Sequence, residues 1–301
     1  MSDVRQPTQL IARMGRKSDK YIASGSDWVN YAKAIEALNE EQTELCDWLI
    51  DQDKGLFLKS SLVSLVANQQ EYSLPADCRR IKRLEIYNNG SSSLWTGHEV
   101  EIVPFIDREM FVRTAYRSVN WYSSKAALRN RKIHALPNPS SSVTNAWRLW
   151  YFAQPPEMLI ATASEGGAST ITLPETATAG TVSAVDDAYN EAWVYISSGT
   201  GSGQLRQCSD YVGDTRVLTV SESWSTQPDA TSVIEVLAAL PREDMEVLAL
   251  GALRRIESSD ADRDGWERNH RADYEMAKLR LLEIESAPQV QNPPRMNIVC
   301  E

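Results

Sequence analysis

The chain has 301 residues, of which 42% are hydrophobic and 24% are charged, and its formal net charge is −10. This length can bury one large core or two smaller ones, and the composition is that of a globular protein. The acidity argues against a free-standing DNA-binding protein, because neutralising phosphates needs a basic surface. No apolar run approaches about eighteen residues, so we expect no membrane-spanning helix.

The residue types that carry most enzyme chemistry are scattered. The four cysteines and three histidines are far apart in the sequence and form none of the common metal or hydrolase motifs. We therefore predict no catalytic residues, no metal or cofactor site and no enzymatic activity. The N-terminus opens without the charged-then-apolar pattern of a secretion signal, so we expect synthesis in the cytoplasm.

The clearest helix pattern follows Ser26, a favourable N-cap residue. Apolar residues then recur at spacings of three and four, which keeps them on one helix face until the helix ends before Gly55. The stripe consists of Trp28, Tyr31, Ile35, Leu38, Leu45 and Leu49. Gln42 interrupts it, either because it fixes the register of the helix or because it lies at the edge of the stripe.

Strand and turn patterns replace the helical pattern from residue 56 to residue 153, with prolines at several strand ends. Pro104 favours a helix over roughly 104–116. Residues 158–237 are rich in Thr, Ser, Gly and Val, and they hold ten acids against two bases. We interpret this segment as an all-β module inserted into a parent domain.

Helical patterns return after Pro241, and Pro288 ends them. The predicted core positions of these two helices are Leu248, Ala252, Ile256, Trp266, Tyr274 and Leu281. Because none of the helices has another long apolar partner, we predict an α+β fold. Its centre is an antiparallel helical bundle built from both ends of the chain, with an antiparallel β region and the inserted module projecting from it.

Several segments resemble the head-to-tail adaptor (connector) proteins of tailed bacteriophages. The long helix "AIEALNEEQTELCDWL" (34–49), the turn and strand "NQQEYSLPADCRRIKRLEIY" (68–87), the strand pair "RKIHALPNP" and "WRLWYFAQPPEM", and the closing helices of 240–283 carry the resemblance. It covers roughly residues 8–157 and 238–286. Residues 199–232, "GTGSGQLRQCSDYVGDTRVLTVSESWSTQPDATS", also resemble a β module common in phage virion proteins.

The resemblance implies a structural protein of the virion neck that forms a ring, commonly of about twelve copies, between the portal protein and the tail. The expected partners are the portal, further copies of the chain, and tail nozzle, tube or fibre proteins. DNA would pass through the lumen without sequence-specific binding, and no membrane is involved. The expected domains are 1–157 with 238–286, the insert 158–237, and an extended C-terminal tail, 287–301, that docks on the portal.

The tail has no core of its own, so it can become ordered by burying apolar side chains on a partner. We predict that its portal-binding residues are Pro293, Pro294, Arg295, Met296, Ile298 and Val299. A frayed terminus is the alternative.

Other functions stay open at this point. The chain could be a different neck or tail protein, such as a nozzle or tail-fibre adaptor, a glycan-binding module, or a cell-wall hydrolase. Basic residues cluster at 79–83 and 129–132. They could face DNA or an acidic partner, although we favour a solvated strand edge or a protein interface.

Overall fold

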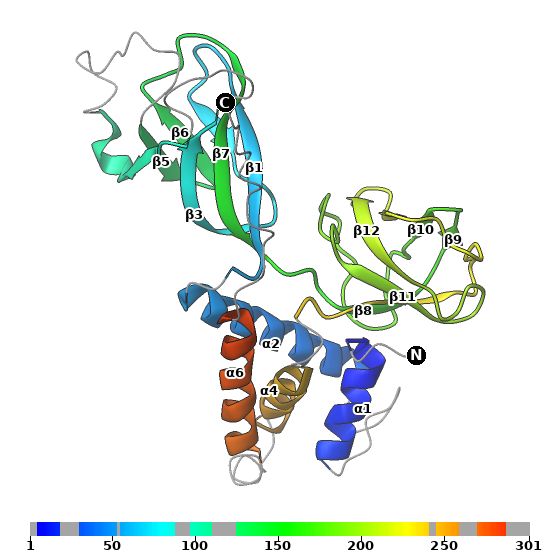
Figure 1. Ribbon diagram of the computed structural model, residues 1–301. Helices are drawn as coiled ribbons and strands as arrows, with labels where there is room; N and C mark the ends of the chain where they lie inside the picture. The colour runs from blue at the N-terminus through cyan, green and yellow to red at the C-terminus, as the bar shows by residue number, and fades with distance from the viewer. Residues whose placement is uncertain are drawn as a thin grey trace, which may run out of the picture.

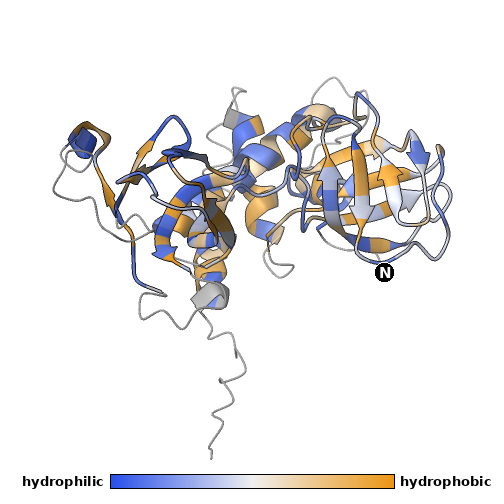
Figure 2. Ribbon diagram, turned by 90° about the horizontal axis from the view of Figure 1, so that it is seen from above, coloured by the Kyte–Doolittle hydropathy of each residue, from blue (hydrophilic) through white to orange (hydrophobic). Residues whose placement is uncertain are grey.

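The computed structural model describes residues 5–18, 30–52, 55–87, 97–109, 125–240, 245–258 and 270–286. Within these ranges the chain forms a helical layer, a body of two sheets, and a separate seven-stranded sheet (Figure 1). The two-sheet body and the seven-stranded sheet lie side by side on the same side of the helical layer, toward its two ends (Figures 1 and 2). No helix among the described residues is long and apolar enough to cross a membrane.

The prediction of a fold centred on a helical bundle from both chain ends is wrong. The described residues contain four α-helices but fourteen strands in three sheets, so the fold is mostly β. The prediction assumed that the helices had only one another as apolar partners. In the structure the core of the helices also includes Met158, Ile160 and Ala179. Met158 precedes the edge strand of the seven-stranded sheet, Ile160 lies in that strand, and Ala179 pairs with Ile160.

The helical layer consists of α1 (Pro7–Lys17), α2 (Tyr31–Asp51), α4 (Met245–Ser258) and α6 (Arg271–Ser286). Helix α4 lies centrally and contacts each of the other three. Asn30 caps α2, since its side-chain oxygen accepts a hydrogen bond of 2.9 Å from the backbone N–H of Lys33. The predicted N-cap Ser26 lies outside the described residues.

The two-sheet body contains a three-stranded sheet in the order β1-β7-β3 and a four-stranded sheet in the order β2-β6-β5-β4. Its strands are β1 (Leu58–Leu65), β2 (Glu71–Ser73), β3 (Cys78–Ile86), β4 (Glu101–Val103), β5 (Lys125–Arg129), β6 (Lys132–Leu136) and β7 (Val143–Ala153). Both sheets bury apolar side chains in one core around Trp147. Pro104 precedes a single 3₁₀ turn, η1 (Phe105–Asp107), and residues 110–116 of the predicted helix lie outside the described residues.

The seven-stranded sheet has the order β8-β14-β11-β12-β13-β10-β9 and is antiparallel throughout. Its strands are β8 (Leu159–Thr162), β9 (Glu165–Gly166), β10 (Thr170–Thr172), β11 (Trp193–Ser198), β12 (Leu205–Val212), β13 (Val217–Val220) and β14 (Val233–Val236). All its buried core residues fall between Leu159 and Val236, so this segment packs around a core of its own.

Candidate functional site

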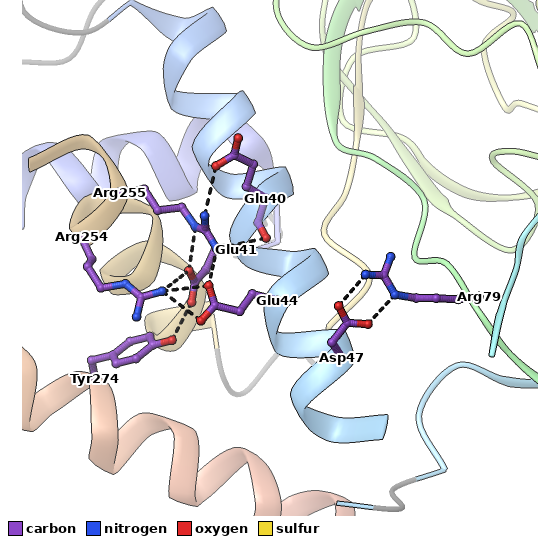
Figure 3. Close-up of polar contacts among 8 residues, drawn as sticks. All are labelled: Glu40, Glu41, Glu44, Asp47, Arg79, Arg254, Arg255 and Tyr274. Carbon is purple, nitrogen blue, oxygen red and sulfur yellow. Dashed lines mark hydrogen bonds and ion pairs between the residues drawn. The ribbon is translucent and has the colours of Figure 1, made fainter. Parts of the chain in front are cut away.

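Helix α2 carries a buried carboxylate at the centre of the helical layer (Figure 3). Glu41 is 0% exposed, and the Tyr274 hydroxyl of α6 donates a 2.7 Å hydrogen bond to it. Arg254 and Arg255 of α4 donate to the same carboxylate at 3.3 and 3.1 Å. A buried carboxylate is costly unless it is paired and hydrogen-bonded, so these three donors are what allow Glu41 to stay inside.

Glu40 and Glu44, two exposed acids of α2, extend this ion-pair network. Glu44 accepts hydrogen bonds from both Arg254 and Arg255, and Glu40 accepts one of 3.1 Å from Arg255. Pairs this open to solvent contribute little individually. Their effect is to hold the two guanidinium groups over Glu41, so that α2, α4 and α6 have one fixed register.

The network also explains a glycine within α4. A Cβ atom built on Gly251 would lie 2.0 Å from a carboxylate oxygen of Glu41, so close that the two atoms would overlap. A glycine inside a helix costs about 1 kcal/mol relative to alanine. Here the missing side chain leaves the space that the Glu41 carboxylate occupies.

The C-terminal end of α2 is bound to the two-sheet body by ion pairs. Arg79 on β3 forms a two-pronged contact with Asp47 (Figure 3), and Arg80 donates to Asp51 at 2.8 Å. The bidentate geometry fixes orientation as well as distance. Part of the predicted basic cluster 79–83 therefore serves as an internal connection between the sheet and the helix.

Two amide side chains of α2 hold the chain where it enters and leaves the seven-stranded sheet. Asn39 donates to the backbone oxygen of Met158 at 3.0 Å and accepts from its N–H at 2.8 Å. Gln42, 1% exposed, donates to Pro156 at 3.0 Å and accepts from the N–H of Ala239 at 2.8 Å. Gln42 thus binds both connecting segments, which is why a polar residue interrupts the apolar stripe.

The seven-stranded sheet also contacts the start of α1 through a buried acid. The Glu235 carboxylate on β14 is 0% exposed and accepts hydrogen bonds from the Thr8 backbone N–H at 3.2 Å and the Thr8 hydroxyl at 2.9 Å. Gln6, the N-cap residue of α1, makes no side-chain cap of its own. The carboxylate replaces that cap and is favourably placed near the positive end of the helix dipole.

None of these contacts resembles a catalytic centre. No group of three or more His, Cys, Asp or Glu side chains suited to a metal ion occurs among the described residues. The three described cysteines are buried, and burial raises the thiol pKa to about 12 at Cys46, about 11 at Cys78 and about 12 at Cys208. Such thiols stay protonated at neutral pH and are poor nucleophiles. The contacts instead fasten two β bodies to one helix.

Comparison with known families identifies the family to which this chain belongs. Residues 8–197 match the family model described as SU10 adaptor protein, which is more than half of the chain. The chain belongs to this family. It is a phage adaptor protein, a structural component of the virion that contacts other capsid or tail components. This confirms the resemblance to phage head-to-tail adaptors. A search of curated proteins found no match.

The adaptor's predicted core residues lie as follows in the described parts of the chain. Eight are at most 1% exposed: Ile35, Leu38, Leu45, Leu49, Leu248, Ala252, Tyr274 and Leu281. Tyr31 and Ile256 are partly buried against them. Three groups of predicted residues lie outside the described residues: Trp28, Trp266, and the portal-binding set Pro293, Pro294, Arg295, Met296, Ile298 and Val299. The structural roles of Asn39, Glu41 and Glu235 were not predicted. The interruption of the apolar stripe at Gln42 was the one sequence signal of buried polar contacts on α2.

Glu235 gives the adaptor's stability a defined pH dependence. Burial raises the pKa of Glu235 above its usual value near 4.5, against the opposing effect of the bonds from Thr8 and Ser197. A carboxyl group with a raised pKa in the folded state stabilises the fold fully below its unfolded pKa, and that stability is lost as pH rises through the folded pKa. The wild type should therefore gain stability relative to Glu235→Gln as pH falls from about 7 toward 4.5.

Urea unfolding of both proteins at a series of pH values tests this, because all other titrating groups are common to the two. Glu165→Gln, which changes an exposed acid of the same sheet, is the matched control and should show no such trend. A stability difference that stays constant or shrinks on acidification would mean that the bonds from Thr8 and Ser197 outweigh the desolvation of the Glu235 carboxyl group.

Proposed function

We propose that this adaptor forms the ring between portal and tail and extends the channel through which DNA leaves the capsid. The observation that carries the proposal is membership of the adaptor family over residues 8–197. Contacts between identical subunits related by rotation close into rings, and about twelve copies would match the expectation from the resemblance. The role is mechanical: the adaptor supports tail assembly and DNA ejection without chemistry of its own.

The internal contacts support a mechanical role. Asp47 and Asp51 of α2 bind the two-sheet body, and Asn39 and Gln42 of the same helix bind both connections of the seven-stranded sheet. A rigid helix that fixes both β bodies can transmit force between the components that lie above and below a ring. The excess of acids in 158–237 suits a surface along which DNA slides without binding.

We further propose that residues 158–237 are an insert, that 1–157 and 238–286 form the parent adaptor, and that 287–301 dock on the portal. The tail would follow α6, whose C-terminal end lies at the side of the helical layer that faces the two-sheet body (Figure 1). Met296, Ile298 and Val299 are its apolar anchors, and the neighbouring prolines limit the entropy lost when it binds.

The experiment is native mass spectrometry of the full chain mixed with the portal ring of the same phage. We expect a portal ring that carries a full set of adaptor copies, and we expect deletion of 287–301 to abolish or severely weaken the complex. Changing Met296, Ile298 and Val299 together to Ser is the finer variant, because it keeps the tail length. Binding to tail components while the portal stays bare would overturn the portal-side position and favour a nozzle or fibre adaptor.

A further inference from the structure

A basic pocket is lined by residues of β2, of the β5–β6 hairpin and of the η1 turn. The β5–β6 hairpin lies on the side of the two-sheet body away from the seven-stranded sheet (Figure 1). The cavity of the pocket measures about 380 Å³. The lining residues that matter here are Glu71, Phe105, Arg108, Arg129, Lys132 and His134. We call this cavity the outer pocket. It lies apart from the contacts that connect α2 to the two β bodies.

Two guanidinium groups in the outer pocket are held in place by one aromatic ring. The Cζ atoms of Arg108 and Arg129 lie 4.0 and 4.7 Å from the centre of the Phe105 ring. A guanidinium stacked on a ring keeps its N–H edge free to donate, and its planar fork matches the oxygens of phosphate. Because stacking already restricts both side chains, less entropy is lost when they bind a ligand.

The β5–β6 hairpin brings a third cation beside them. Asn130 and Arg131 have φ values of 50° and 56°, as in the tight two-residue turns of hairpins. This turn places Arg129 and Lys132 directly opposite each other across the two strands. Like charges in such a pair repel, and Glu71 offsets only the charge of Lys132, so a bound anion would lower the remaining repulsion.

The described residues that line the outer pocket have an excess of two positive charges. Among them Glu71 is the only acid, and it pairs with Lys132 at 2.6 Å. His134 is buried, and its pKa is lowered by desolvation, with further lowering by Arg108, Lys132 and Arg129 and an opposing effect of Glu71. The imidazole is therefore neutral at pH 7 and leaves the excess at two. A local positive excess is unusual in a chain of net charge −10.

We propose that the outer pocket binds a phosphate group. Free phosphate carries between about −1.5 and −2 at neutral pH, which matches the excess charge, whereas each phosphodiester of a DNA backbone carries a single negative charge. Two guanidinium groups and an ammonium offer more donors than one carboxylate can accept, whereas phosphate oxygens can use them. The phosphate comes either from the backbone of DNA or from free phosphate in solution. The binding chemistry does not depend on where the adaptor lies in the virion.

Titration of the full chain with inorganic phosphate, followed by NMR of the His134 imidazole, tests the proposal. We expect saturable binding that raises the pKa of His134, because the added negative charge favours its protonated form. Arg108→Gln and Arg129→Gln should each weaken binding about tenfold, the loss expected for one charged hydrogen bond. Arg271→Gln removes an exposed arginine at the start of α6 and should leave binding unchanged. Circular dichroism checks that each variant is folded.

Two further titrations decide whether the phosphate comes from DNA or from solution, and whether the outer pocket prefers phosphate to carboxylate. A short oligothymidylate that binds more tightly than inorganic phosphate, with a loss in Arg129→Gln, would identify the DNA backbone as the source. A response to inorganic phosphate alone would identify free phosphate. The proposal is overturned if phosphate leaves the His134 signal unchanged, or if an acidic peptide binds at least as tightly as both phosphate ligands, which would make the outer pocket a protein-docking site.

Discussion

Glu41→Ala is expected to lower the free energy of unfolding by about 3 kcal/mol, the largest single loss we predict for the helical layer. The substitution removes the carboxylate that Arg254, Arg255 and Tyr274 share, and it leaves the tyrosine hydroxyl buried without its acceptor. Burial and the nearby Glu41 charge raise the pKa of Tyr274, so this hydroxyl is a proton donor at any ordinary pH. Urea unfolding followed by circular dichroism at the helix band measures the loss.

Two controls separate the buried carboxylate from its exposed neighbours. Glu44→Ala removes an acid that contacts the same two arginines but is 46% exposed, so we expect a loss below about 1 kcal/mol. Glu41→Gln keeps an acceptor for Tyr274 while removing the charge, and it should fall between the two. If Glu41→Ala cost no more than Glu44→Ala, the buried carboxylate would not be the centre of the network.

The apolar half of the helical layer could be predicted from the sequence, because periodicity reports which residues share a face. Ile35, Leu38, Leu45 and Leu49 repeat at helical spacing, and all four are buried. The same periodicity places Glu41 beside that face but does not reveal that it is buried. Its partners lie more than two hundred residues away in the chain, and only the folded structure brings them together.

The balance between helices and sheets could not be predicted for a related reason. Strong helical stripes suggested that the helices formed the centre of the fold, because a stripe shows that a face is covered without showing what covers it. Part of the covering comes from Met158 and Ile160 at the margin of the seven-stranded sheet. The short strands of 159–236, by contrast, give weak individual signals, although together they enclose a core of their own.

Gly251→Ala is expected to destabilise the wild-type adaptor by about 2 kcal/mol, although alanine is the better helix former by about 1 kcal/mol. The added methyl group would meet the Glu41 carboxylate, whose nearest oxygen lies 2.0 Å from its position. Glu41 cannot move aside without weakening the bonds from Arg254, Arg255 and Tyr274. The steric cost therefore exceeds the gain in helix propensity.

The sign of this effect should reverse when the carboxylate is absent. In a Glu41→Ala background the methyl group of Gly251→Ala meets no carboxylate, so helix propensity alone should stabilise the double variant by about 1 kcal/mol relative to Glu41→Ala. A double-mutant cycle by urea unfolding measures the coupling directly. Equal effects of Gly251→Ala in both backgrounds would mean that Gly251 is glycine for a reason other than Glu41. A reversal of sign would show that the small residue on α4 and the buried charge on α2 form one structural unit.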